Sequence, residues 1–167
     1  NPMNTNYRNN FTKEEYDKMM VCSYSEKVEL INKYNAKNYY DADYIITYKN
    51  ETRKKYNELM CERLNIKNLD DVGAKLICKT NDLRNQNIYN KFMFEVKETT
   101  NEYIIITDGN EDYKLTEKQL YKNFDFGYAV TLYCIQGASV GSIYYCPEDI
   151  ESIGGRGVYT LISRIKI

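Results

Sequence analysis

The sequence predicts an α/β fold interrupted by a small antiparallel β unit, and three observations lead to this prediction. A β-branched and aromatic run at 43–48 is followed by Asn50 at an N-cap position and a helical pattern at 51–63, which together form a strand, a cap and a helix. Residues 75–116 then contain short alternating segments with a strong turn signal near their end. From residue 128 onward, apolar strand-like runs indicate a return to α/β structure.

Two short helices are predicted ahead of the first strand. The segments 12–20 and 23–34 each open with Thr or Ser three residues before a Glu, which is the spacing of a capping box. Residues 1–10 are polar and rich in Asn, so we expect a disordered lead-in there.

The β unit is predicted from three strand-like segments at 75–79, 92–97 and 102–107. The Asp-Gly-Asn sequence at 108–110 is a turn signal, and 113–115 could return as a further strand. This pattern favours a mostly antiparallel sheet.

The last part of the chain contains two predicted strands, at 128–132 and 141–145. Gly154–Gly157 is expected to form a flexible loop, because three of its four residues are glycine. The apolar positions of 158–167 suit a buried helix and a buried strand equally well.

The composition excludes several classes of function. A chain of 167 residues that is 43% hydrophobic and 28% charged can form one domain with a sizeable core. The net charge of -1 argues against a strongly basic nucleic-acid module, although a local basic groove stays possible. The absence of His excludes a His-based catalytic triad and removes the commonest metal ligand, and no metal site is predicted.

The cysteine pattern and the hydropathy indicate an intracellular protein, in the cytoplasm, the nucleus or a viral factory. The five cysteines contain no CxxC pair, so we expect buried thiols rather than a zinc knuckle or a disulfide scaffold. No apolar stretch approaches the ~20 residues that span a bilayer, and no signal peptide is recognisable. A membrane partner is therefore not expected.

The sequence lacks the common phosphate-binding motifs, and its charged runs fall in predicted loops and on a predicted helix. The sequence has no GxxxxGK[ST] phosphate loop and no GxGxxG before a helix. The carboxylate pairs Asp70–Asp71 and Glu148–Asp149 fall in predicted loops, where a solvated surface is expected. The run Arg53–Lys55 is either a solvated helix face or a patch that contacts phosphates.

Four segments, in order, resemble motifs of one family. Residues 44–50 read Tyr-Ile-Ile-Thr-Tyr-Lys-Asn, with a second Asn at Asn57; residues 79–91 contain Asn-Asp and then Asn-Ile-Tyr-Asn-Lys. Residues 128–137 read Tyr-Ala-Val-Thr-Leu-Tyr-Cys-Ile-Gln-Gly, and residues 158–164 read Val-Tyr-Thr-Leu-Ile-Ser-Arg. The chain resembles the C-terminal motor domain of superfamily 1 DNA helicases of the 5′-to-3′ branch.

The resemblance implies a fold and a domain organisation. The expected fold is a RecA-like three-layer domain with a mainly parallel sheet, built from residues 11–74 and 123–167. Residues 75–122 would form the small β insertion, for which an SH3-like barrel is expected. The chain would be the C-terminal piece of a longer enzyme, whose first motor domain carries the phosphate loop.

The resemblance also implies nucleotide-binding residues. Arg164 matches the arginine that reaches the γ-phosphate of ATP, a task suited to a permanently charged planar fork. Gln136 and Gly137 match the Gln-Gly pair beside the nucleotide. ATP and Mg²⁺ would be cofactors of the full-length enzyme, and this fragment alone would bind neither. Without the resemblance, Arg164 would be assigned to a helix-surface ion pair, and the Gln-Gly pair to an ordinary turn.

Single-stranded DNA is the implied partner, together with the N-terminal motor domain. Thr131 matches the Thr that faces the nucleic-acid backbone, where hydroxyls and backbone amides are suitable phosphate donors. Asn50 is assigned to the same side of the motor. Most of the 18 tyrosines are expected to be strand and core aromatics, but Tyr133 is a candidate platform on which a base could stack. The family's His-Lys-Ser is replaced here by Tyr133-Cys134-Ile135, and the second motif glycine by Lys91.

Two functions follow. The first is the C-terminal motor domain of an ATP-dependent DNA helicase, inactive alone, with DNA replication as the expected setting and a large DNA virus or AT-rich protist as the source. The alternative is a diverged, non-catalytic α/β module that binds protein or nucleic acid.

Overall fold

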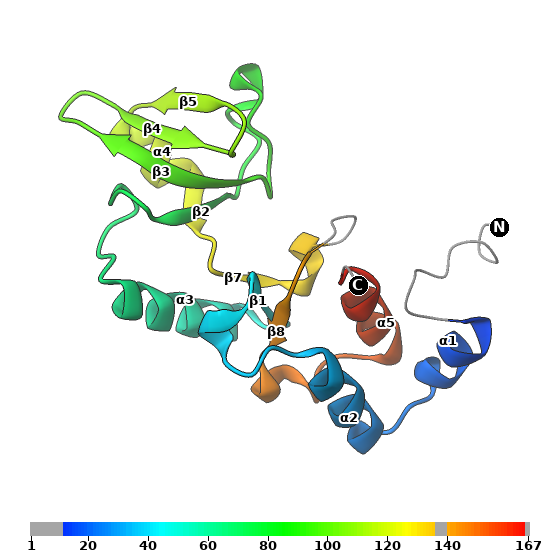
Figure 1. The fold of residues 1–167 in the computed structure, drawn as a ribbon. Helices are drawn as coiled ribbons and strands as arrows, with labels where there is room; N and C mark the ends of the chain where they lie inside the picture. Colours follow the sequence, from blue (N-terminus) through cyan, green and yellow to red (C-terminus); the bar gives the residue numbers. More distant parts are fainter. Residues whose placement is uncertain (1–11, 136–139, 166–167) are drawn as a thin grey trace. The chain divides into compact units, whose positions relative to one another are not determined.

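The computed structural model describes residues 12–135 and 140–165, and its chain forms two compact units (Figure 1). The first unit consists of the described parts of Asn1–Tyr56 and Ala129–Ile167, and the second is Asn57–Tyr128. The fold is α/β, as predicted, with one parallel and one antiparallel sheet.

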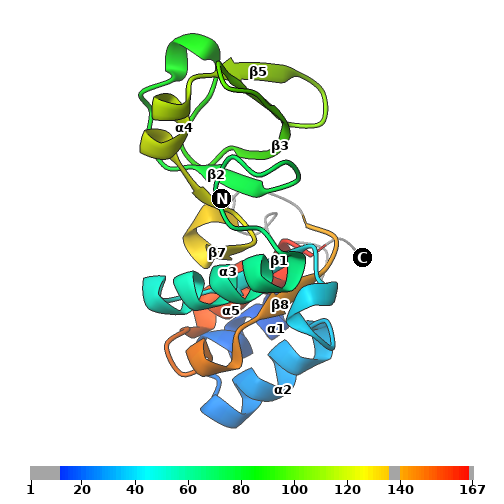
Figure 2. The ribbon, with the colours of Figure 1, turned by 90° about the vertical axis from the view of Figure 1, so that its left-hand side faces the viewer.

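The first unit is built on a three-stranded sheet in the order β7-β1-β8. Its strands are β1 (Tyr44–Thr47), β7 (Ala129–Thr131) and β8 (Ile143–Tyr145), and both neighbours run parallel to β1. The helix α3 (Asn50–Leu64) starts on one side of this sheet, and α5 (Gly155–Ser163) lies on the other (Figure 2). These are the three layers that the sequence predicts for a RecA-like domain.

Both predicted N-terminal helices are confirmed, as α1 (Lys13–Met20) and α2 (Tyr24–Tyr34). Each begins with a complete capping box, in which the N-cap hydroxyl and the Glu side chain satisfy backbone N–H groups reciprocally. Both helices pack against α5. The rings of Tyr16 and Tyr159 meet edge to face at 4.7 Å, and Ile31, from α2, is completely buried.

The second unit contains a five-stranded antiparallel sheet in the order β5-β4-β3-β2-β6. The strands are β2 (Lys75–Cys78), β3 (Met93–Thr99), β4 (Ile104–Thr107), β5 (Asp112–Leu115) and β6 (Phe124–Phe126). The predicted turn joins β4 to β5, and Gly109 adopts the left-handed φ of 97° that such a turn requires. The core includes Leu76, Phe94 and Ile106.

Two segments differ from the prediction. Gly154–Gly157 is not a flexible loop, because α5 starts at Gly155 and includes the two residues that follow. A Cβ on Gly155 would lie 2.1 Å from the carbonyl oxygen of Met19, so this glycine allows α1 to approach α5 closely. The helix α4 (Glu117–Asn123) was missed, although Thr116 and Gln119 form a capping box.

Short 3₁₀ turns complete the described chain: η2 (Tyr39–Asp41), η3 (Arg84–Gln86), η4 (Leu132–Ile135) and η5 (Pro147–Asp149). All five cysteines are free thiols. Cys61, Cys78 and Cys146 are buried, as predicted, whereas Cys22 and Cys134 are partly exposed. None of the helices in the described part of the chain combines the length and the apolar character that crossing a bilayer requires.

Candidate functional site at the carboxyl edge of the parallel sheet

The parallel strands of the first unit end at a common edge. Thr47 is paired with Thr131, so β1 and β7 finish level with each other, and β8 finishes beside Ile46. From this edge β1 leads into α3, β7 into η4, and β8 into η5. Ligands of open α/β sheets bind outside the carboxyl ends of the strands, so this edge is the candidate site.

The structure brings the three residues predicted to contact nucleic acid to this one edge. Asn50 is the first residue of α3 and is exposed, and its Oδ1 accepts a hydrogen bond from Nε of Arg53 at 3.3 Å. Thr131 is the last residue of β7, and its hydroxyl lies 3.5 Å from Sγ of Cys134. Tyr133, in η4, is 66% exposed.

Asp149 holds the connection between β1 and α3. One carboxylate oxygen accepts hydrogen bonds from the backbone N–H groups of Tyr48 (2.7 Å) and Lys49 (3.1 Å). The other accepts from the hydroxyl of Thr52 at 2.8 Å. Asp149 is only 1% exposed, so the predicted solvated surface at this carboxylate was wrong.

The position of Asn50 also differs from the prediction. The carbonyl of Lys49 accepts the backbone N–H of Arg53 at 3.1 Å, so Lys49 occupies the N-cap position and Asn50 lies inside the first turn. Asp149 therefore fixes the two residues that lead into α3 from about a hundred residues away in the sequence.

The neighbouring Glu148 pairs with two side chains of α3. Its carboxylate accepts from Nζ of Lys55 and from the hydroxyl of Tyr56, both at 2.9 Å. Partial burial opposes ionisation of Glu148, but hydrogen bonds from the backbone, Lys55 and Tyr56 outweigh it and lower the pKa of the carboxyl group. Burial, followed by the bond to Glu148, raises the pKa of Tyr56. Of the run Arg53–Lys55, Lys55 is therefore engaged in an ion pair, while Lys54 is exposed.

Arg164 lies at a different end of the sheet. It follows the last residue of α5, and its carbonyl accepts the N–H of Val140 at 2.8 Å, while Ile165 forms a parallel bridge with Val140. Val140 precedes β8, so the backbone of Arg164 lies beside the amino end of that strand. The side chain is partly exposed with a buried Nε. Gln136 and Gly137 lie outside the described residues.

The second unit preserves the backbone of its predicted motif without the glycines. Lys91, which stands at the position of the second motif glycine, has a φ of 76°, and Asn87, four residues earlier, has a φ of 64°. Both values are in the left-handed region that favours glycine. The replacement of the second motif glycine by Lys91 has therefore not removed the left-handed backbone conformation.

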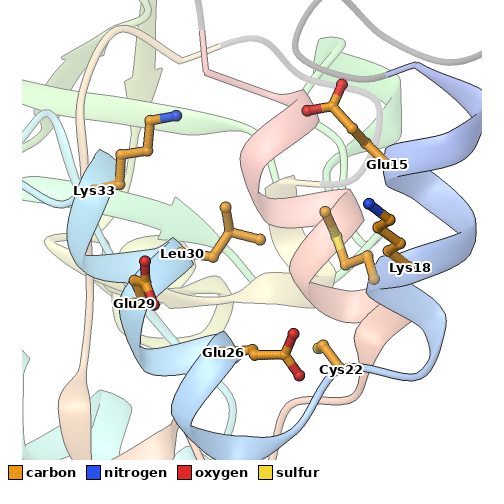
Figure 3. A pocket seen from close by; sticks show the side chains of 8 residues that line it. Glu15, Lys18, Cys22, Glu26, Glu29, Leu30 and Lys33 are labelled. Atoms are coloured by element: carbon orange, nitrogen blue, oxygen red, sulfur yellow. The ribbon is translucent and has the colours of Figure 1, made fainter.

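A pocket of about 510 Å³ lies between α1 and α2, and none of the predicted site residues lines it (Figure 3). Met19 and Leu30 contribute its apolar surface, and charged side chains of both signs, including Glu15, Lys18 and Lys33, surround it. Across residues 12–135 and 140–165, no group of three acidic or cysteine side chains could hold a metal ion.

Comparisons with solved structures show what the fold resembles. The chain matches a structure of two coordinating Pif1 helicases at forked double-stranded DNA, with 14% identity, a TM-score of 0.64, and coverage of 91% of this chain and 44% of that chain. Bacteroides Pif1 bound to single-stranded DNA matches with 13% identity and a TM-score of 0.60, over 91% of this chain and 46% of that chain. Pif1 helicase from Bacteroides in complex with ADP-AlF3 and single-stranded DNA matches with 17% identity and a TM-score of 0.55, over 100% of this chain and 47% of that chain.

The chain thus spans about half the length of the solved structures that it matches. No protein-family model and no curated protein matches the sequence. At these identities the likeness concerns the fold alone. The parallel three-stranded sheet and the antiparallel five-stranded sheet agree with the helicase domain that the sequence motifs predict. The chain has the fold of a Pif1-like, RecA-like helicase domain.

Proposed function

We propose that this chain is the C-terminal motor domain of an ATP-dependent superfamily 1 DNA helicase of the 5′-to-3′ branch. In this role it binds single-stranded DNA and closes on ATP held by a separate phosphate-loop domain of the same polypeptide. The domain boundaries at 11–74, 75–122 and 123–167, and an intracellular location, belong to the same proposal.

One observation carries the proposal: Asn50, Thr131 and Tyr133 meet at the carboxyl edge of a parallel sheet. They reach it from two adjacent strands of a fold whose solved relatives include proteins bound to single-stranded DNA. The amide and the hydroxyl can donate to phosphate oxygens, and the exposed tyrosine ring can stack on a base.

The nucleotide part of the proposal concerns Arg164, Gln136 and Gly137. A guanidinium stabilises the charge that develops on a transferring phosphoryl group, and Arg164 is proposed for this role. The described residues offer no acidic cluster for Mg²⁺, so the ion and the phosphates would be bound by the other domain. The chain by itself is therefore proposed to hydrolyse no ATP.

The test is a titration of the 167-residue chain with a fluorescent oligothymidine over a range of salt concentrations. We expect weak, salt-sensitive binding that falls for Thr131→Val and for Tyr133→Ala. Tyr24→Ala is the matched control, because Tyr24 is 55% exposed at the start of α2, away from the carboxyl edge. DNA-stimulated ATP turnover by the chain alone, or loss of binding by the control only, would contradict the proposal.

The departure at Tyr133-Cys134-Ile135 favours a second candidate, a non-catalytic module that has lost coupling to ATP. The two candidates differ in what the full-length reading frame encodes. A phosphate loop upstream of this chain supports the motor domain, and its absence supports the binding module.

A further inference from the structure

The loop between β2 and β3 carries two exposed aromatic rings on the surface of the second unit. Tyr89 is 39% exposed and Phe92 is 48% exposed. Their ring centroids lie 5.3 Å apart with an interplanar angle of 62°, so they form an edge-to-face pair. An aromatic pair left at the surface rather than packed in the core is a feature that marks binding surfaces.

This loop is anchored on both sides of the rings. Ile88 is completely buried, and the N–H of Asn90 donates to Oδ1 of Asn81 at 3.0 Å. The N–H of Lys91 donates to the carbonyl of Cys78 at 2.7 Å, and that of Cys78 donates to the carbonyl of Phe92 at 2.8 Å. The two rings are therefore presented on a fixed backbone, which lowers the entropy that a ligand must remove.

The backbone of the loop is also held in an unfavourable conformation. Left-handed φ values are disfavoured at non-glycine residues, and Lys91 and Asn87 both have them. Lys91 immediately precedes Phe92, so its conformation determines the direction in which the chain continues into Phe92. The surrounding hydrogen bonds and the buried Ile88 maintain this geometry.

The charge around the pair favours an anionic partner. From 83 to 92 the chain contains Arg84 and Lys91, both exposed, and no acidic residue. Just before it, Asp82 is engaged in an ion pair with Lys122 at 3.5 Å. The same segment carries the amides of Asn85, Asn87 and Asn90. Aromatic rings interleaved with cations and amides are how proteins bind single-stranded nucleic acid.

We propose that Tyr89 and Phe92 form a second contact for single-stranded nucleic acid, separate from the carboxyl edge of the parallel sheet. A base stacks on the aromatic pair, and the cations of Arg84 and Lys91 lie toward the adjacent phosphates. The choice of single-stranded nucleic acid as the ligand rests on the proposed function. The binding site itself is new, because the sequence motifs predict no nucleic-acid contact in the second unit.

The experiment titrates the 167-residue chain with a fluorescent oligothymidine of about 16 nucleotides, the upper end of the usual site size. Tyr89→Ala and Phe92→Ala should each weaken binding about fivefold or more, because one stacked base is worth about 1–3 kcal/mol. The slope of affinity against salt should not change for either variant. Arg84→Gln should instead flatten that slope by about 0.7, the value for one phosphate contact on a single strand.

Two kinds of control separate stacking from folding. Tyr89→Phe and Phe92→Tyr keep a ring at each position and should bind like the parent chain. Tyr24→Ala removes an exposed ring in the other unit and should also leave binding unchanged. Melting curves of all variants should agree, since both loop rings are partly exposed and their removal leaves Ile88 in place.

The outcomes distinguish this inference from the proposed function. If the parent chain binds no oligothymidine, both proposals fail. If Tyr133→Ala weakens binding while Tyr89→Ala and Phe92→Ala do not, the aromatic pair is not a nucleic-acid contact and the inference alone is overturned. That second result would leave the pair as a docking surface for a protein.

Discussion

Replacing Asp149 by Ala removes a buried carboxylate that joins segments far apart in the sequence. The variant leaves three donors without their acceptor: the N–H groups of Tyr48 and Lys49, and the hydroxyl of Thr52. All three lie at the start of α3, so the expected consequence is a looser connection between β1 and α3. This is the turn that carries Asn50 to the candidate site.

The magnitude follows from these contacts. A hydrogen bond to a charged group contributes about 1.5–3 kcal/mol, and Asp149 accepts three such bonds. Burying the carboxylate itself has a desolvation cost, which offsets part of this gain. We therefore expect Asp149→Ala to lower the free energy of unfolding by about 3 kcal/mol, which corresponds to a fall of about 6–12 °C in Tm for a chain of this size.

The assay is thermal and urea unfolding of the parent chain and three variants. Asp149→Asn keeps the shape but has one acceptor oxygen in place of two, so it should lose about 2 kcal/mol by the same hydrogen-bond scale. Glu148→Gln is the matched control, since it removes a neighbouring carboxylate whose ion pair with Lys55 is largely exposed and worth under about 1 kcal/mol.

This structural role of Asp149 is refuted if Asp149→Ala and Glu148→Gln destabilise the chain equally. It is also refuted if Asp149→Ala unfolds within about 0.5 kcal/mol of the parent, the range of an ordinary surface substitution. Either result would mean that the three hydrogen bonds of Asp149 do not determine the conformation at the start of α3.

Three further predictions concern single positions. Lys91→Gly should be more stable than Lys91→Ala by about 1 kcal/mol in urea unfolding, because glycine adopts a φ of 76° without strain. At the exposed Lys118 in α4, the control position, the alanine variant should be the more stable one, and equal stabilities of the two Lys91 variants would contradict backbone strain at Lys91. Gly155→Ala should destabilise by about 1–3 kcal/mol despite the better helix propensity of Ala, because its Cβ would meet the backbone of α1; a higher Tm would show that α1 can move away. Arg164→Lys in the full-length enzyme should reduce ATP turnover by about 10³-fold or more, and turnover within about twofold of the parent, ~0.4 kcal/mol of barrier, would exclude the finger role.

Several elements were predictable because their signals are local in the sequence. The capping boxes at Thr12 and Ser23 set the starts of α1 and α2 because both partners lie within one helical turn. The turn at Gly109 determined the pairing of β4 with β5, because glycine accepts the left-handed conformation there. Thr116 and Gln119 carried the same kind of signal for α4, so that helix was predictable although it was missed.

The ordered family motifs predicted more than local patterns could, because they indicated a fold that pairs β1 with a strand more than eighty residues later. They also placed Asn50, Thr131 and Tyr133 on the strands that meet at one edge. The roles of these residues and of Arg164 stay predictions.

Features that depend on residues distant in the sequence were not predictable from local patterns, and the fold established them. Asp149 was indistinguishable from a solvated loop carboxylate until the fold placed it against Tyr48 and Thr52, about a hundred residues away. Gly155 has the sequence signature of a loop, but it is the first residue of α5 and contacts α1 closely. Tertiary packing outweighs the unfavourable helix propensity of glycine, which is about 1 kcal/mol. Lys91 adopts a left-handed backbone conformation, which is unfavourable for a residue with a side chain. The hydrogen bonds of its loop and the nearby buried Ile88 stabilise this conformation.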